Sequence, residues 1–191
     1  MSNGSHTIVS IILTLVTTAN RTRRFKQSDP QRITEILESL GRCAQLFSQR
    51  SLVVAADHST HIFSPASLTR IEIETSTDLT PYLPAGSNVT LRALALGEAI
   101  PEIEINDTLI SVPIDLFFEG GDTLSMWLDN NRPADAIERT MRISRLFEQP
   151  VLIYRPTTPG IGLINPQAMT RAAVGAALPD VPAGSWYASE G

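Results

Sequence analysis

Two histidines lie three residues apart in the run Asp57-His58-Ser59-Thr60-His61. Imidazole and carboxylate groups at such a spacing could bind zinc or, beside a nucleophile, form a catalytic triad. The zinc site would need a further ligand and the triad a placed nucleophile, and the pattern supplies neither. We therefore interpret this run as a polar turn between two strands.

The single cysteine, Cys43, is the other reactive side chain. One thiol excludes an internal disulfide and a cysteine-pair zinc site. A catalytic thiol would need a histidine that the sequence does not place beside it, so we interpret Cys43 as a small buried residue. The pair Gly160 and Gly162 lacks the following helix that a dinucleotide-binding loop requires. We therefore predict that the chain is not an enzyme and uses no metal or cofactor.

The charged residues argue against a nucleic-acid partner. The chain of 191 residues has a net charge of -5, whereas nucleic-acid binders are usually basic. The basic run Arg21 to Lys26 is interpreted as a solvated strand edge. Lys26 is the only lysine among 15 basic residues. Either arginine-rich codon usage in a GC-rich genome or a place in a lysine-modification pathway would explain this composition.

An apolar run from Ile8 to Val16 could be taken for a signal peptide. It has no basic flank and is too short to span a bilayer. A similar run recurs inside the chain, which favours a strand in both places. We expect a cytoplasmic protein with no membrane contact.

The elements that would position these residues occur twice. Pro65 to Arg70 (PASLTR) is echoed by Pro166 to Arg171 (PQAMTR) at an offset of 101 residues. The turn Pro-Ala-Gly-Ser occurs at Pro84 and again at Pro182, an offset of 98. Matches in the same order at nearly the same offset indicate a duplicated domain.

Each copy shows the same predicted order of elements. A hairpin is followed by a helix with proline in its first turn, a strand, a short apolar pair and a last strand after the Pro-Ala-Gly-Ser turn. In the first copy the predicted segments are 7–17, 22–27, a helix from Pro30, 52–56, 62–63 and 88–96. In the second copy they are 108–118, 123–128, a helix from Pro133, 151–154, 163–164 and 186–191.

This order is that of the β-grasp fold, in which a mixed sheet wraps one main helix. We predict an α+β protein with two tandem β-grasp domains, residues 1–97 and 108–191, joined by a linker at 98–107. The first and last strands of each domain are expected to pair in parallel, because the chain must return past the helix to close the core.

At this point the chain resembles ubiquitin. The resemblance rests on Gly121-Asp122-Thr123-Leu124 after a first strand, the helix from Pro133, the strand Val151 to Tyr154, and the turn Pro84 to Ser87 before Val89 to Arg92. Two such domains in one chain resemble the interferon-induced tandem ubiquitin-like modifier of vertebrates and its bacterial counterparts in antiphage operons.

The resemblance implies that the protein is conjugated rather than catalytic. The carboxylate of Gly191 would be activated with ATP by an activating enzyme, passed to a conjugating enzyme as a thioester, and joined to a target protein. Ser189 and Glu190 would form the tail that leads to it, and a JAB-type protease would remove the modifier. The tail departs from ubiquitin in having no double glycine.

A partner enzyme of that pathway would need a surface to recognise. Ile153, Tyr154 and Trp186 are predicted to form an exposed apolar patch near the C-terminus. The alternative is that strand periodicity turns these side chains into the core. The alternative function is a tandem β-grasp adaptor that binds a partner and is never conjugated.

Overall fold

The computed structural model describes residues 10–56, 58–87, 89–95, 104–105, 109–131, 145–175, 184–186 and 188. The predicted helix from Pro133, most of the predicted linker and the tail residues Ser189, Glu190 and Gly191 lie outside the described residues.

The first half begins with an antiparallel hairpin, β1 (Ile11–Thr17) and β2 (Thr22–Gln27). Helix α1 (Pro30–Leu40) follows, as predicted. The Asp29 carboxylate accepts hydrogen bonds from the backbone N–H groups of Gln31 and Arg32, which otherwise have no partner within the helix. The buried face of α1 consists of Ile33, Leu37 and Leu40.

The rest of the first half is built from short elements. They are the 3-10 helix η1 (Cys43–Ser48), the hairpin β3 (Leu52–Ala56) and β4 (Ser59–Phe63), η2 (Pro65–Ser67), β5 (Leu68–Glu74), η3 (Thr80–Tyr82) and β6 (Leu91–Ala93). The strand predicted at 88–96 is therefore present but shorter.

The second half repeats part of this series within the described residues. Its elements are β7 (Glu104–Ile105), β8 (Leu109–Phe118), η4 (Glu119–Gly121), β9 (Thr123–Asn131), η5 (Leu146–Glu148), β10 (Leu152–Arg155), β11 (Gly160–Ile164), η6 (Pro166–Ala168) and β12 (Met169–Val174). Gly120 and Gly121 adopt φ angles of 81° and 84° between β8 and β9, which confirms the turn predicted from the paired glycines.

Irregular details recur at the same offset, which supports the duplication. The pairing of β1 with β5 shifts register beside Thr69, whose hydroxyl donates to the Val16 carbonyl at 3.2 Å. The pairing of β8 with β12 shifts beside Thr170, whose hydroxyl donates to the Phe117 carbonyl at 3.2 Å. Bulges are specific features of a strand pair, so we match β1, β2, β3, β4 and β5 with β8, β9, β10, β11 and β12.

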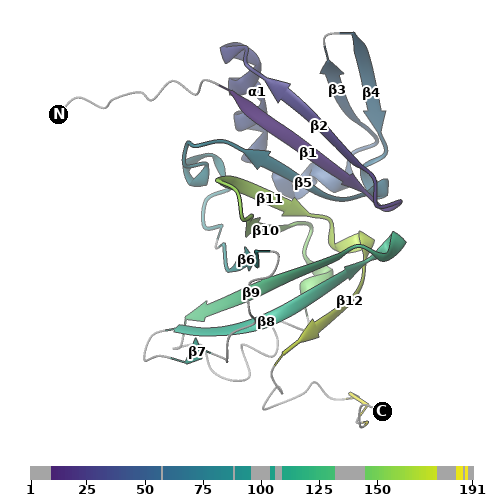
Figure 1. Ribbon diagram of the computed structural model, residues 1–191, viewed down its shortest axis with the longest axis vertical. Coiled ribbons are helices and arrows are strands. Elements are labelled where there is room, and N and C mark those ends of the chain that lie inside the picture. Colours follow the sequence, from purple (N-terminus) through teal and green to yellow (C-terminus); the bar gives the residue numbers. More distant parts are fainter. Residues whose placement is uncertain are drawn as a thin grey trace, which may run out of the picture.

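Ten of the described strands, from both halves, join into one large mixed sheet, and β3 and β4 form a separate two-stranded sheet. The order of the large sheet is β12-β8-β9-β6-β10-β11-β5-β1-β2, with β7 paired to β8. Figure 1 shows α1 and β1 to β5 at the top, β8, β9 and β12 at the bottom, and β6, β10 and β11 between them. Strand β6 of the first half lies between β9 and β10 of the second half, and β11 pairs with β5. The prediction of two tandem β-grasp sheets is not confirmed, because strand pairing crosses between the halves.

The predicted parallel pairing of first and last strands is wrong. Strand β1 lies between β2 and β5 and is antiparallel to both. The segment after η2, which the sequence analysis placed outside the strands, forms β5 and takes the position beside β1. Strand β6 instead pairs in parallel with β10, because β5 has already filled the sheet next to β1.

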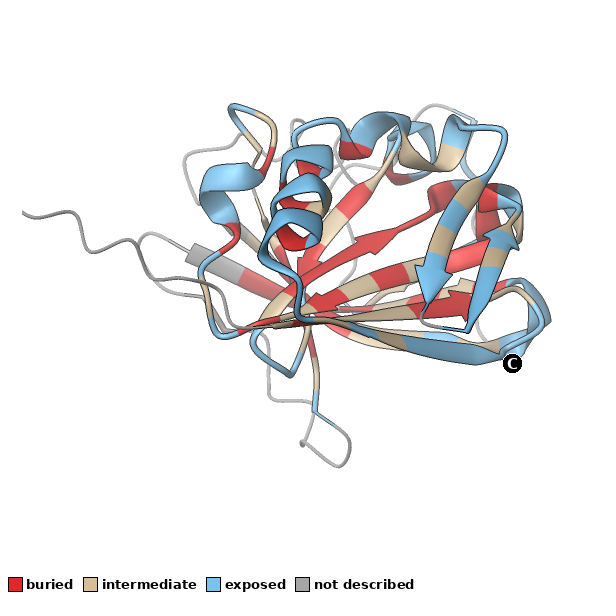
Figure 2. Ribbon diagram, turned by 90° about the horizontal axis from the view of Figure 1, so that it is seen from above, coloured by how far each residue is buried: buried red, intermediate tan, exposed pale blue. Residues whose placement is uncertain are grey.

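The core lies on both faces of this sheet. One cluster joins α1 to β5 and β11 through buried residues that include Ile33, Ile73 and Leu163. Another joins β6, β8, β9 and β10 through residues that include Leu116 and Met126. Figure 2 shows that buried residues follow the strands, whereas the outer faces of α1 and of the β3–β4 hairpin are exposed.

Candidate binding site

The junction between the halves is held by an aromatic ring that crosses three strands. Tyr154 on β10, Gly162 on β11 and Glu72 on β5 are register partners in turn. A Cβ atom at Gly162 would lie 2.0 Å from the Tyr154 ring, so only glycine leaves room for it. The Tyr154 hydroxyl then reaches across and donates to the Glu72 carboxylate at 2.5 Å.

Charged groups from both halves meet around this hydroxyl. Arg70 donates to Glu72 at 3.2 Å and also forms an ion pair with Asp122, in the turn before β9. Burial, followed by the charge and hydrogen bond of Glu72, raises the pKa of Tyr154 above its ordinary value. The phenol is therefore neutral and acts as a donor that fixes β10 over β5.

Backbone contacts complete the junction. The Asn165 side chain is buried and its amide donates to the carbonyls of Pro65 and Leu68 in the first half. Gly120 packs against the Thr18 carbonyl so closely that a Cβ atom would lie 1.6 Å away. The two halves are thus one packed unit over the described residues.

Strand β6 fills a position that we call the strand slot of the second half, between β9 and β10. Leu91 and Ala93 are buried there, and Arg92 between them is exposed. Leu91 is opposite Leu128 on β9 and beside Tyr154 on β10. The slot therefore accepts an extended segment antiparallel to β9 and parallel to β10.

The matching position in the first half lies between β2 and β3, and no strand of the described chain occupies it. Strand β2 pairs only with β1, and β3 only with β4, within the described residues. A groove of about 630 Å³ opens here and is lined by residues 25–27 of β2 and 52–56 of β3. Residues 25–27 are the counterparts of 126–128, which pair with β6. We call this the β2–β3 groove.

The walls of the β2–β3 groove are apolar and its rim is polar. Apolar lining comes from Leu13, Phe25, Ile36, Leu52 and Val54, among others. Three of the rim charges are engaged locally, since Asp29 caps α1 and Arg32 and Glu35 form an ion pair at 3.8 Å. The groove thus offers apolar contacts flanked by two strand edges that pair with no other strand in the described part of the chain.

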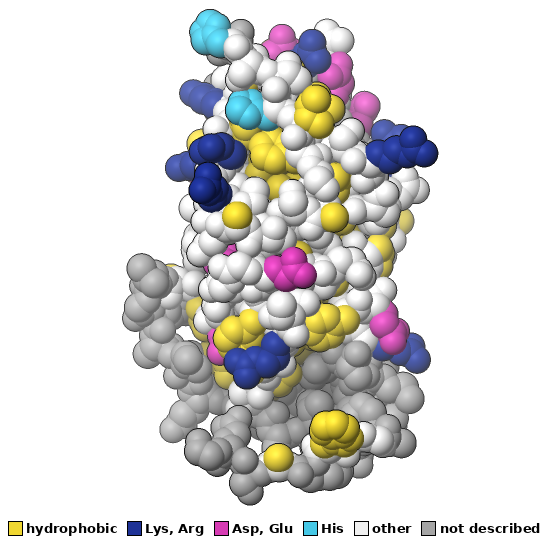
Figure 3. Space-filling view, turned by 90° about the vertical axis from the view of Figure 1, so that its right-hand side faces the viewer, with side chains coloured by type: hydrophobic (Ala, Val, Ile, Leu, Met, Phe, Trp, Pro, Cys, Tyr) yellow, Lys and Arg dark blue, Asp and Glu magenta, His cyan; other side chains and the backbone are white. Residues whose placement is uncertain are grey.

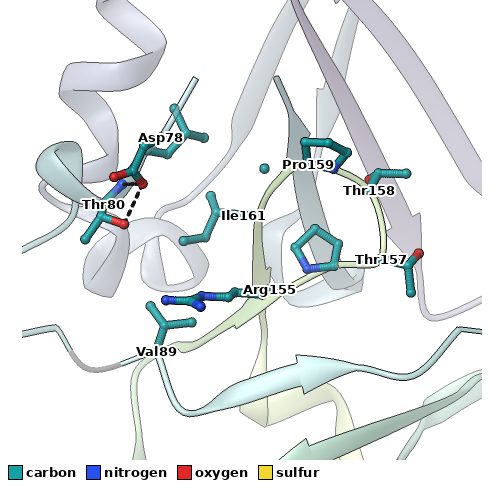
Figure 4. Close-up of a pocket in the computed structure, with 11 residues that line it drawn as sticks. Asp78, Thr80, Val89, Arg155, Thr157, Thr158, Pro159 and Ile161 are labelled. Carbon is teal, nitrogen blue, oxygen red and sulfur yellow. Dashed lines mark hydrogen bonds between the residues drawn. The ribbon is translucent and has the colours of Figure 1, made fainter. Parts of the chain in front are cut away.

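A second cavity, of about 380 Å³, lies where η3 meets the turn between β10 and β11. Figure 4 shows Arg155 beside Ile161 and Val89, with Asp78 hydrogen-bonded to Thr80. These bonds from Thr80, with Arg155 as a weaker influence, lower the pKa of Asp78. The cavity is thus a crevice lined by both polar and apolar side chains.

The structure separates the residues of the predicted apolar patch. Tyr154 is 0% exposed and belongs to the core, so its assignment to an exposed patch is wrong, because period-2 alternation turns it toward Gly162. Ile153 is partly buried against the other core cluster. Trp186 is 97% exposed. Gly191, Ser189 and Glu190 lie outside the described residues.

Of the reactive side chains, Ser59 and His61 contact each other, whereas Cys43 lies in the core. Ser59 Oγ lies 2.9 Å from His61 Nε2 on the exposed β4 strand. Among the described residues, no three histidine, cysteine or acidic side chains gather as a metal site would require. Cys43 is buried, and burial raises the pKa of its thiol. No helix within the described ranges has the length and apolar character needed to cross a membrane.

Comparisons of the chain with protein-family models, with curated proteins and with solved structures find no match.

Sequence reasoning missed the β2–β3 groove. The signal that could have found it is the offset of 101 residues, which aligns 25–27 with 126–128. That alignment becomes informative only once β6 is known to pair with the second half.

Proposed function

We propose that this chain is a binding protein that accepts an extended polypeptide segment in the β2–β3 groove. The observation that carries the proposal is internal to the molecule. The same pair of strands in the second half, β9 and β10, holds β6 between them.

Strand addition gives affinity through backbone hydrogen bonds and selectivity through alternate side chains. In the first half the β3–β4 hairpin forms a separate two-stranded sheet. A segment bound between β2 and β3 would join that hairpin to the main sheet, as β6 joins β10 to β9. The bound state therefore gains two ladders of backbone hydrogen bonds and covers the apolar lining.

The segment itself should alternate apolar and polar residues. Leu91 and Ala93 point inward from β6 and Arg92 points outward, with its guanidinium 5.8 Å from the Trp127 ring centroid. The counterpart of Trp127 is Lys26 on β2. We therefore expect the middle residue of the bound segment to be acidic or neutral, and its neighbours to be apolar.

A peptide that copies β6 tests the proposal. A fluorescently labelled peptide of residues 88–96 with glutamate in place of Arg92 (NVTLEALAL), so that an acidic residue faces Lys26, is titrated with the full chain, and saturable binding is followed by anisotropy. Ser39 is exposed and lines the groove, so Ser39→Trp should weaken binding at least about tenfold, while Glu38→Trp, next to it but outside the groove, should not.

Two outcomes would contradict the proposal. One is equal binding to the wild type and to Ser39→Trp, which would place the peptide elsewhere. The other is no binding at about 1 mM protein, a limit already weak for a specific complex. A peptide with aspartate in place of Leu91 and Ala93 controls for the apolar contacts.

The second candidate is the tandem ubiquitin-like modifier that the sequence resembles, conjugated through Gly191. Its support is the repeated order of elements and the exposure of Trp186, close to the C-terminus. Its partners would be activating, conjugating and deconjugating enzymes and a target protein. A cognate activating enzyme with ATP should form a thioester with the wild type and none after deletion of Gly191.

A further inference from the structure

We propose that the segment bound by the β2–β3 groove comes from a second copy of this chain, so that copies join head to tail. Within one chain the first half meets the second half through β6, which lies between β9 and β10, and through β5, which pairs with β11. The second half of one copy would meet the first half of the next copy through the counterparts of these contacts. This inference rests on the proposed function and names its partner.

The outer edges of β4 and β12 fit a head-to-tail arrangement of copies. Inside the chain, β5 pairs with β11, and residue Ile71 is opposite Leu163. The counterpart of β5 is β12 and that of β11 is β4. In the described residues, β12 pairs only with β8 and β4 only with β3. A second copy could therefore add its β4 to β12, with Ile62 opposite Ala172 by the same register.

The exposed apolar side chains of the hairpin fit the same junction. Ile62 is 72% exposed, whereas its counterpart Leu163 is 2% exposed at the junction with β5. Val53 is opposite Ile62 and is 55% exposed, and its counterpart Ile153 is partly buried. Ile62 and Val53 are thus exposed on the β3–β4 hairpin, whereas their counterparts Leu163 and Ile153 are covered at the junction where β11 pairs with β5. Figure 3 shows hydrophobic side chains surfacing next to histidine at the upper end of that face.

Charge favours the chain's own C-terminal segment as the strand donor. Strand β6 follows the first Pro-Ala-Gly-Ser turn, and residues 186–191 follow the second. At the offset of 98, Glu190 takes the place of Arg92. Arg92 is opposite Trp127, whose counterpart is Lys26. A neighbouring copy would therefore place Glu190 opposite Lys26, an opposite-charge cross-strand pair.

Such contacts join two different surfaces of the same molecule. Heterologous interfaces of this kind form rings if the rotation between copies closes and open chains if it does not. The second half of one copy meets the first half of the next, so each copy keeps one donor end and one acceptor end until a ring closes.

Light scattering after size-exclusion chromatography tests the proposal on the full chain. The wild type should show concentration-dependent masses above the 20.8 kDa of one chain. Ile62→Arg should return it to one chain, because the side chain is exposed in the single copy and covered in the assembly. Tyr82→Arg, at an exposed aromatic residue outside β3, β4 and β12, should leave the masses unchanged, and circular dichroism checks that each variant is folded.

A cross-linking experiment tests the direction of assembly. Ile62→Cys and Ala172→Cys variants are treated with a short bis-maleimide, alone and mixed. Cross-linked dimers should form in the mixture and not with either variant alone. Native Cys43 is buried and serves as an internal control. Dimers formed by Ile62→Cys alone would indicate a symmetric contact and overturn the head-to-tail arrangement.

A wild-type chain that stays at 20.8 kDa at about 1 mM would also overturn this inference, because interfaces of standard size associate far below that concentration. Binding of the 88–96 peptide is measured separately. A monomer that binds the peptide would retain the proposed function and discard the self-assembly, whereas a chain that does neither would discard both.

Discussion

Replacing Gly162 with alanine tests the account of the junction most directly. Its Cβ atom would lie 2.0 Å from Tyr154 Cε1 and 2.2 Å from Tyr154 Cζ. Those distances are far inside van der Waals contact, so the ring must move. Tyr154 is fully buried and its hydroxyl is tied to Glu72, so movement also weakens that bond.

The expected cost follows from these two effects. Overpacking a core by one methyl group costs about 1–3 kcal/mol, and weakening the hydrogen bond to a charged acceptor adds about 1 kcal/mol. We therefore expect Gly162→Ala to lower the free energy of unfolding by about 3 kcal/mol. For a chain of this size that corresponds to a fall in Tm of about 6–12 °C.

Urea unfolding monitored by tryptophan fluorescence measures the effect. Trp127 is 2% exposed and Trp186 is 97% exposed, so the change in emission reports mainly on Trp127, which lies beside β6. The halves share one sheet, and we expect a single cooperative transition. Gly162→Ala should shift its midpoint without changing its slope.

The matched control is Gly41→Ala, after helix α1. Gly41 has a right-handed helical conformation, and a Cβ atom there would have its nearest neighbour at 3.5 Å. Alanine should be neutral or stabilise by about 0.4–1 kcal/mol, because it restricts the unfolded chain. If Gly162→Ala were as stable as this control, or if the wild type unfolded in two separate steps, the described junction would be refuted.

Three further predictions concern the buried polar groups. The wild type should lose stability as pH rises above about 10, because the raised pKa of Tyr154 keeps it protonated only in the folded state; Tyr154→Phe should reduce this alkaline loss and cost about 1–2 kcal/mol at neutral pH in urea titrations. Asp122→Ala should cost about 2 kcal/mol in the same assay, since it removes one of the two carboxylates that pair with the largely buried Arg70 and leaves Glu72. Cys43 should resist a thiol reagent such as 5,5'-dithiobis-(2-nitrobenzoic acid) at neutral pH and react once the protein unfolds, whereas rapid labelling of folded protein would contradict its burial.

The local elements were predictable because their signals are local. Asp29 and Pro30 define the start of α1, and the paired glycines at 120 and 121 define the turn between β8 and β9. Runs rich in β-branched and apolar residues, interrupted by a polar break or by paired glycines, predicted both opening hairpins. The offset of 101 residues predicted that the second half would repeat the first, and the matching bulges at Thr69 and Thr170 agree with it.

The sequence did not predict which strands pair with one another in the sheet. Strand β5 was missed although Ile71 to Glu74 alternates apolar and charged residues as a half-buried strand does. Its place between β1 and β11 is what the sequence could not supply. Because β5 pairs with the edge of β1, β6 pairs instead with β9 and β10, and the predicted parallel pairing of first and last strands within one half is wrong. A strand's hydrogen bonds can be satisfied by any suitable edge, so the sequence does not say which edge it meets.

The sequence by itself determined the elements, their duplication and the residue types that each carries. Only the tertiary structure decided that Tyr154 faces Gly162 rather than solvent, that one sheet spans both halves, and that β2 and β3 stand apart around a groove. The physical reason is that turns and caps depend on neighbours in the chain, whereas strand pairing and burial depend on segments about a hundred residues away competing for the same edge and the same core.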